Sequence, residues 1–353
     1  MATARAADTV HDVSNLDQHP AEAFFGGRLA VATEPVRELL PAREVVLGGP
    51  RGTLVRRTLP QRDHRMVGAW CFVDHYGPEN IAGGPGMRVP PHPHTGLQTV
   101  SRLVAGDVLH NDSLGNRQLI RPGQLNLMTA GRGIAHSEQS PPGHQPVLHG
   151  VQLWIALPAA DRDVPPQFEH HADLPILTEA GTDTGTGGNG GGSGSAGHGV
   201  AVTVLMGEID GAGSPARIYS PLVAAEIELG ANATGRLPLR ADFEYAALGL
   251  TGSGEVDGVR LAPGPMLYLG TGRSELAVGA DRPSRVLLLG GEPFEERIVM
   301  WWNLIGRDHD EIVTARADWM AGRRFGTVHG YDGDPLPAPE MPTTRLKPRG
   351  RRG

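Results

Sequence analysis

The chain has 353 residues and a formal net charge of −7 at pH 7, with 50 glycines, 30 prolines and one cysteine. The length suggests two domains or one large β domain with extensions, and frequent glycine and proline fit short strands joined by turns. A single cysteine excludes an internal disulfide framework. The sequence shows no secretory signal and no long apolar run, which predicts a cytoplasmic protein without a membrane span. The body has no basic block, so no nucleic-acid partner is expected.

Residues 1–42 are predicted to form an N-terminal extension, and residues 43–177 an antiparallel β domain. The expected strands of this domain alternate with turn residues and show no helical period. They cover residues 55–60, 69–77, 97–106, 107–112, 124–131 and 149–158. Asp112 to Asn116 are typical of a hairpin turn.

Residues 178–199 form a Gly/Ser-rich loop that is predicted to be disordered, because it cannot bury enough apolar area to offset its chain entropy. A second β domain is predicted over 200–325, and its segment from Tyr245 to Gly254 resembles the one from Leu97 to Gly106 in the first domain, which indicates an internal repeat. Its expected strands cover 199–209, 222–230, 243–256, 265–270 and 284–294. A short helix is predicted over 309–323, capped by Asp308 or Asp310, before a tail at 326–353 that we expect to fray as a solvated, partly basic end.

Two clusters of polar residues are candidates for a metal site. His92-Pro93-His94 and His136-Ser137-Glu138 each place two possible ligands at positions i and i+2. In a β-strand these positions share one face, so two neighbouring strands would bring three imidazoles and a carboxylate together. This donor set suits a first-row metal such as iron(II) with open coordination positions. The alternative is that these are exposed or hydrogen-bonded histidines, which is the commoner state of a single His-x-His.

The chain resembles the pirin family, a group of bicupin proteins. The resemblance rests on HPHTGLQTVSRLVAGDVLHNDSLGN and PGQLNLMTAGRGIAHSE in the first domain, and on GGEPFEERIVMWWNLIGRDHDEI near the end of the second. It implies an all-β fold of two cupin barrels (double-stranded β-helix or jelly-roll) with a short C-terminal helix. It also implies one mononuclear iron in the first barrel, with His92, His94, His136 and Glu138 as ligands; the second copy lacks both motifs.

The resemblance further implies a dioxygenase similar to quercetin 2,3-dioxygenases, acting on a flavonol or related phenol with O2. Glu138 is the candidate acceptor of the substrate hydroxyl proton, because a carboxylate that loosens from the metal is a positioned base. Two alternatives stay open: a redox-sensing regulator that acts on protein partners through its iron, and a protein whose metal is largely structural. The residues do not distinguish iron from other first-row divalent metals, and they do not name the substrate.

Several further residues are candidates for the surroundings of the metal. Asp74 and His75 are candidates for hydrogen bonds that orient the ligands. Phe72, Met128 and Gln152 could line the pocket, although ordinary packing is the favoured alternative for all five residues. His110, in the HNDSLGN turn, is expected to be structural, and Cys71 to be a small buried hydrophobic residue.

Overall fold

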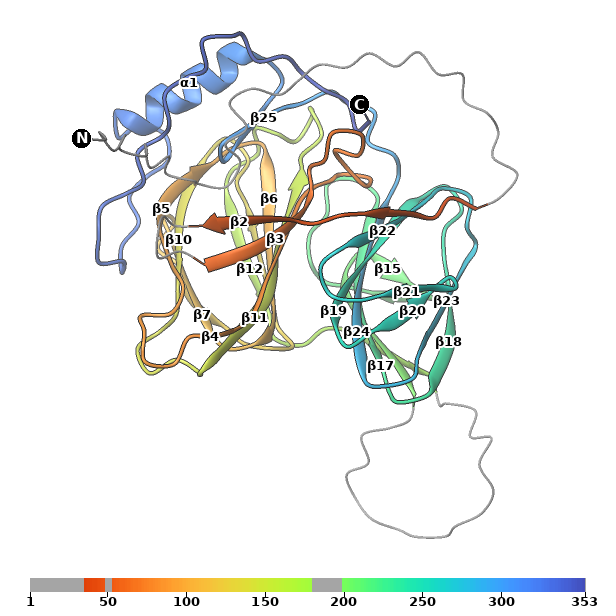
Figure 1. Cartoon of the computed structure of the whole chain (residues 1–353). Coiled ribbons are helices and arrows are strands. Elements are labelled where there is room, and N and C mark those ends of the chain that lie inside the picture. Colours follow the sequence, from red (N-terminus) through yellow and green to blue (C-terminus); the bar gives the residue numbers. More distant parts are fainter. Residues whose placement is uncertain (1–34, 48–52, 180–198, 353) are drawn as a thin grey trace, which may run out of the picture.

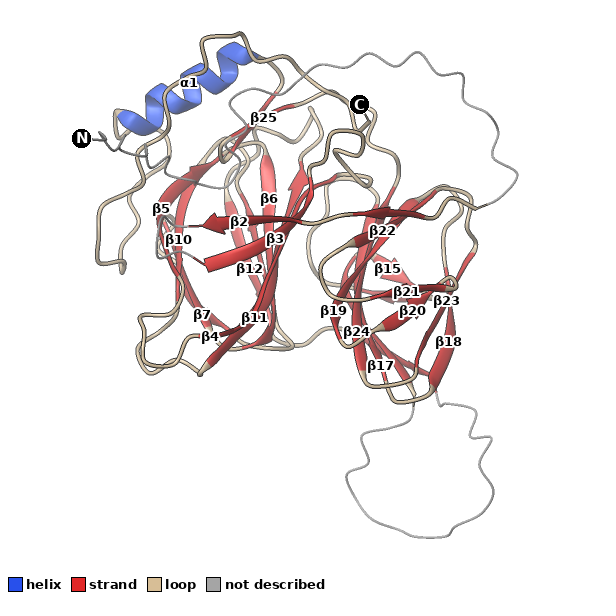
Figure 2. Cartoon of the chain, viewed as in Figure 1, coloured by secondary structure: helices blue, strands red, loops and turns tan. Residues whose placement is uncertain are grey.

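The computed structural model describes residues 35–47, 53–179 and 199–352, which form two β barrels side by side and one helix (Figures 1 and 2). Most of the predicted N-terminal extension, and nearly all of the Gly/Ser-rich loop predicted to be disordered, lie outside the described residues. No helix of the described part is long and apolar enough to cross a membrane.

The first barrel pairs a seven-stranded sheet with a four-stranded sheet. The larger sheet has the order β12-β9-β6-β11-β4-β3-β2 and the smaller one the order β5-β10-β7-β8. The strands are β2 (Arg43–Leu47), β3 (Thr53–Leu59), β4 (Trp70–Asn80), β5 (Arg88–His94), β6 (Leu97–Ala105), β7 (Val108–Asp112), β8 (Arg117–Ile120), β9 (Leu125–Thr129), β10 (Ile134–Gln139), β11 (Val147–Ala156) and β12 (Gln167–His171).

The second barrel repeats this arrangement, with sheets β1-β22-β19-β24-β17-β14-β13 and β18-β23-β20-β21. Its strands are β1 (Glu38–Leu40), β13 (Ile176–Glu179), β14 (Val200–Met206), β17 (Leu222–Leu229), β18 (Ala233–Pro238), β19 (Glu244–Thr251), β20 (Gly254–Val256), β21 (Val259–Leu261), β22 (Met266–Gly270), β23 (Glu275–Ala280) and β24 (Ser284–Gly291). In this order β19 takes the place of β6 and β22 that of β9, so the internal repeat seen in the sequence appears again in the strand order. The edge strand beside β22 is β1, which comes from the segment predicted as an extension.

Two short hairpins, β15–β16 (Glu208–Ile209 with Ala212–Gly213) and β25–β26 (Val299–Trp301 with Leu304–Gly306), precede the helix α1 (His309–Met320). The side chain of Asp308 accepts a hydrogen bond from the backbone of Glu311, so Asp308 is the cap. The predicted strand over 243–256 is two strands, β19 and β20, because Gly252 turns the chain with φ +70°.

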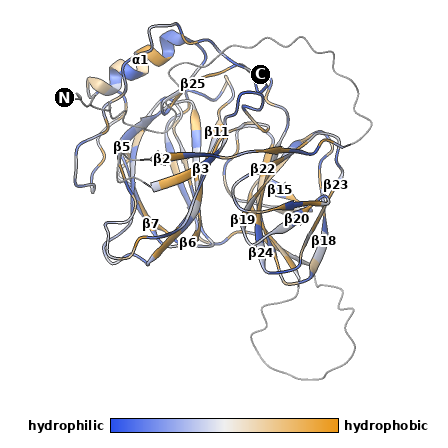
Figure 3. Cartoon of the chain, viewed as in Figure 1, coloured by the Kyte–Doolittle hydropathy of each residue, from blue (hydrophilic) through white to orange (hydrophobic). Residues whose placement is uncertain are grey.

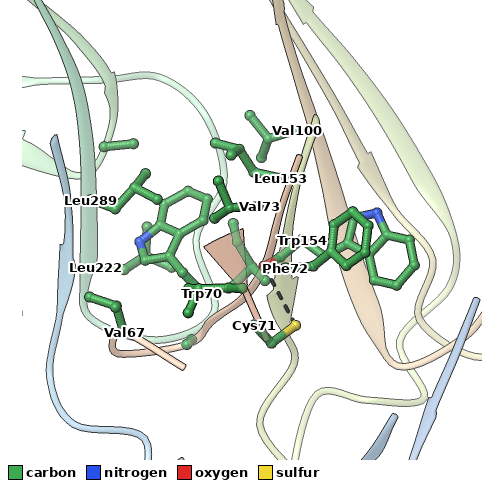
Figure 4. Close-up of a cluster of buried hydrophobic side chains, with 14 of the residues drawn as sticks. Val67, Trp70, Cys71, Phe72, Val73, Val100, Leu153, Trp154, Leu222 and Leu289 are labelled. Carbon is green, nitrogen blue, oxygen red and sulfur yellow. Dashed lines mark hydrogen bonds between the residues drawn. The ribbon is translucent and has the colours of Figure 1, made fainter. Parts of the chain in front are cut away.

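A continuous apolar core joins the two barrels. Hydrophobic residues gather along the strands (Figure 3), and Figure 4 shows Trp70, Val73 and Val100 of the first barrel near Leu222 and Leu289 of the second. The indole N–H of Trp70 also donates a hydrogen bond to the backbone oxygen of Gly290 on β24, over 3.1 Å. The barrels are therefore held as one unit by buried side chains.

The C-terminal tail packs on the body, so the expectation of a frayed end is wrong for residues 326–352. Its partly buried apolar residues, Val328, Leu336, Met341 and Leu346, lie against a core that contains Trp302 and Phe325. Arg351 pairs with the buried Glu244 over 3.1 Å. The contributing apolar residues are widely spaced and show no period, so the sequence pattern alone did not indicate a packed segment.

Candidate metal centre

The two predicted ligand clusters lie on neighbouring antiparallel strands of the smaller sheet. His136 on β10 stands opposite His92 on β5, and Ile134 stands opposite His94. A register irregularity between His136 and Glu138 then shifts the end of β10. All four predicted residues are buried, with exposed fractions of 8% or less. The strand pairing expected from the spacing is thus present.

Three imidazoles converge within this barrel. One ring nitrogen from each of His92, His94 and His136 lies within 4.8 Å of the others, and the two Nε2 atoms of His94 and His136 are 3.1 Å apart. Two nitrogens bound at right angles to one metal, each at about 2.1 Å, would be separated by about 3 Å. The observed spacing therefore fits two ligands of a common ion.

Hydrogen bonds to backbone oxygens fix the tautomers of two of these rings. Nδ1 of His92 is 2.8 Å from the oxygen of Pro90, and Nδ1 of His94 is 3.0 Å from the oxygen of Asn303. Because a carbonyl oxygen can only accept, each Nδ1 must carry the proton. Each Nε2 is left with a free lone pair, as a metal ligand requires.

Burial keeps the imidazoles neutral. Desolvation lowers the pKa of His92 to about 4 and the pKa values of His94 and His136 well below the usual value, and the neighbouring imidazoles add to the effect. At neutral pH the three rings are therefore uncharged, which is the form that binds metal.

Glu138 borders this group on one side. Its carboxylate, with His110 and His136, forms a second, overlapping group whose ligand atoms lie within 4.8 Å of one another. Burial raises the pKa of Glu138, opposed by His110 and by a hydrogen bond that the hydroxyl of Ser101 donates to Oε1 over 2.9 Å. His136 belongs to both groups, and a single site that uses all four predicted ligands stays a prediction.

Aromatic side chains border the imidazoles. Phe72 and Trp154 stack on each other (Figure 4). Their ring centroids are 4.0 Å apart, and Trp154 meets His94 edge-on at 5.1 Å. Gln152 lies close to the site, since its amide is 2.8 Å from the hydroxyl of Ser101. Phe72 and Gln152 thus lie near the predicted site, and Met128 stands opposite Phe168, the ring that stacks on His110.

Asp74 and His75 make no hydrogen bond to a candidate ligand, which agrees with the favoured interpretation that both residues serve packing. Asp74 makes a bidentate ion pair with Arg57, in which Nε and Nη2 of the guanidinium donate to the two carboxylate oxygens over 2.7 and 2.8 Å. His75 is hydrogen-bonded to His149, with their Nε2 atoms 2.8 Å apart. Asp74 shares the face of β4 that carries Phe72, but its carboxylate is paired with Arg57, whereas strand alternation turns His75 to the opposite face.

Sequence reasoning missed His110, which was expected to be structural. Its Nδ1 lies 3.4 Å from Nδ1 of His136, and its Nε2 lies 3.1 Å from Asp112. His110-Asn111-Asp112 has the same i, i+2 spacing as the two predicted clusters, and this spacing was the available signal.

The corresponding strands of the second barrel carry apolar side chains. Leu237 on β18 stands opposite Leu276 on β23, and both are buried with Val278. Within the described residues, groups of three or more potential ligands occur in the first barrel only. This distribution agrees with the expectation from the two sequence repeats.

Comparisons with known proteins point to one family. The family model described as Pirin matches residues 52–155, and the one described as Pirin C-terminal cupin domain matches residues 224–326. A Pseudomonas aeruginosa relative, whose name proposes a quercetin 2,3-dioxygenase, is 44% identical over 310 residues, or 88% of this chain and 92% of its own. A pirin-like protein of Caulobacter vibrioides is 38% identical over 76% of this chain and 88% of its own. The crystal structure of a quercetin 2,3-dioxygenase from Acinetobacter baumannii, at 40% identity, superposes with a TM-score of 0.79 over 88% of this chain and 97% of that one.

Proposed function

The chain belongs to the pirin family, and from this premise we propose that it is a metal-dependent dioxygenase that oxidises quercetin or a related flavonol. The observation that carries the proposal is the convergence of three neutral, buried imidazoles, two of them with Nε2 atoms 3.1 Å apart. The names of the similar Pseudomonas and Acinetobacter proteins support the choice of substrate class.

In this proposal His92, His94, His136 and Glu138 hold one iron(II) ion. Imidazole and carboxylate donors also suit other first-row divalent metals, so iron is the proposed metal and not the only one these donors fit. When bound, the ion would acidify the substrate hydroxyl and support the reaction of the flavonol with O2.

Glu138 is the proposed acceptor of the hydroxyl proton. Burial raises its pKa, so its carboxylate holds a proton more readily than an exposed one. The hydroxyl of Ser101 has one proton and can donate it to one acceptor only. It donates to Glu138 when the side-chain amide of Gln152 is oriented with its NH2 group toward Ser101, so that Gln152 donates to the hydroxyl oxygen. This chain of contacts would orient the carboxylate. Quercetin and O2 would then give a phenolic ester and carbon monoxide.

The aromatic pair next to the imidazoles suits a flat phenolic substrate. Trp154 contacts both Phe72 and His94, so an apolar wall lies directly beside a proposed ligand. Such a wall can stack on a flavonol ring and exclude water from the reacting atoms.

The test is O2 uptake with quercetin by iron-loaded protein. Removing a general base costs about 10²–10⁴-fold in rate, so we expect Glu138→Gln to lose at least about 100-fold. Glu228→Gln, an exposed carboxylate on β17, should behave as the wild type. Unchanged uptake in Glu138→Gln would contradict the role of this carboxylate, and no uptake by iron-loaded wild type with any flavonol would refute the proposed activity.

A second candidate, a redox-sensing regulator, has one supporting observation: the segment that follows the helix, residues 325–336, is hydrogen-bonded to the ligand strands. Leu336 donates its backbone N–H to Pro91, beside His92, and Ala135, beside His136, donates to Phe325. A change at the metal could thus alter an outer segment that a partner protein recognises. Hydrogen exchange of residues 325–336 that differs between the iron(II) and iron(III) forms would support this candidate, and identical exchange would remove its basis.

A further inference from the structure

His110 projects from β7 toward one of the proposed ligands. Its Nδ1 is 3.4 Å from Nδ1 of His136, and its Nε2 is 3.1 Å from Oδ2 of Asp112. The ring is 3% exposed and stacks on Phe168, with centroids 4.4 Å apart and 16° between the planes. A side chain held on its face and at both nitrogens has little freedom to rotate.

The protons of this chain of contacts can be assigned in order. Asp112 is an acceptor, since hydrogen bonds from His110 and Asn116 outweigh its burial and lower its pKa. In its neutral form His110 donates from Nε2 to this carboxylate and presents an unprotonated Nδ1 to His136. That nitrogen can only accept, so Nδ1 of His136 carries a proton and Nε2 of His136, which faces His94, is left free.

Asp112 itself is anchored by the turn that follows it. Its Oδ1 accepts from the backbone N–H groups of Leu114 and Asn116, at 2.9 and 3.0 Å, and Oδ2 accepts from the side-chain amide of Asn116 at 2.8 Å. The turn thus fixes the carboxylate that fixes His110.

We propose that Asp112 and His110 form a hydrogen-bonded relay that sets the tautomer and ring orientation of His136, which makes His110 a positioning residue of the metal centre. His92 and His94 are oriented by backbone oxygens instead. Among the three proposed imidazole ligands, His136 is therefore the one oriented by a side chain, that of His110, which can be changed by mutation. The inference rests on the proposed metal site, and its test measures metal binding in place of catalysis.

Two substitutions separate positioning from packing. His110→Phe keeps a ring to stack on Phe168 but removes both nitrogens. His110→Asn loses the ring but places an amide oxygen near the position of Nδ1, where it can accept from His136. A packing role predicts that Asn is the more damaging change, whereas the relay predicts that Phe is.

The experiment is titration of the metal-free full chain with Co²⁺ against a chelator, together with the visible spectrum of bound Co²⁺. We expect His110→Phe to weaken binding by about 10–100-fold, the usual effect of losing such a partner, and to change the spectrum, while His110→Asn stays much closer to the wild type. His149→Phe is the matched control: it replaces a histidine of equal burial, 3% exposed, that is bonded to His75 and not to a proposed ligand. Its Co²⁺ affinity should be that of the wild type.

The outcomes are distinct. Equal losses of Co²⁺ affinity in both variants would make His110 a metal ligand. A larger loss in His110→Asn than in His110→Phe would make it a packing residue. Either result, or an unchanged affinity in His110→Phe, would overturn the relay. Failure of the folded wild type to bind Co²⁺ would instead count against the proposed metal site.

Discussion

Replacing Glu226 by glutamine should weaken the attachment between the barrels. Glu226 on β17 is fully buried and accepts from Arg102 on β6 and from Arg285, each at 2.8 Å. The side chain of Arg102 is 3% exposed, so the substitution leaves a guanidinium buried without its counter-charge. Breaking a buried ion pair on one side costs about 3–5 kcal/mol, and we expect a loss in that range. Arg285 adds less, because it is one-third exposed.

The assay is urea unfolding followed by circular dichroism and by tryptophan fluorescence, whose agreement tests two-state behaviour. Glu275→Gln is the control, because its pair with Arg236 is exposed on both sides and should contribute less than about 1 kcal/mol. The double variant Arg102→Leu/Glu226→Leu should be more stable than either single leucine variant, since it leaves neither charge of this pair alone. A loss below about 1 kcal/mol for Glu226→Gln, or additive losses in the double variant, would contradict the predicted cost of leaving Arg102 buried without its partner.

Three further predictions concern stability and reactivity. Burial lowers the pKa of His75 to about 3 and that of His149 to about 4, so below pH 6.5 the unfolded chain binds protons that the folded chain does not. The free energy of unfolding should therefore fall as the pH falls from 6.5 toward 4. A urea midpoint that is constant over this range would contradict this prediction. Gly96→Ala should destabilise the protein by more than about 1 kcal/mol and weaken Co²⁺ binding, because Gly96 has φ +68° and a Cβ would lie 2.5 Å from the oxygen of Ile305. A variant with the stability and the Co²⁺ affinity of the wild type would contradict this close contact. Burial raises the pKa of Cys71 to about 12, so a disulfide reagent should label it only after unfolding, and rapid labelling of the native protein would count against its burial.

The strands and the candidate ligands could be predicted from local spacing. Alternation along a strand places His92 and His94 on one face, and the same rule brought His136 and Glu138 into the candidate set. His110 and Asp112 obey this rule too, but their place beside a turn favoured a structural interpretation.

Contacts between distant segments could not be predicted in this way. The oxygen that orients His94 belongs to Asn303, 209 residues away in sequence. Asn303 follows Trp302 in the tight β25–β26 turn, where Trp302 has φ +52°. Packing of this hairpin against the first barrel brings the two segments together, and no local pattern contains that information.

We propose above that the first barrel holds a metal through His92, His94, His136 and Glu138. The most direct measurement is the metal content of protein purified without oxygen, for the wild type, His136→Ala and the control His149→Ala. We expect about one iron per chain in the wild type and in the control, and a large loss in His136→Ala. A folded wild type without bound metal, or full occupancy in His136→Ala, would contradict it.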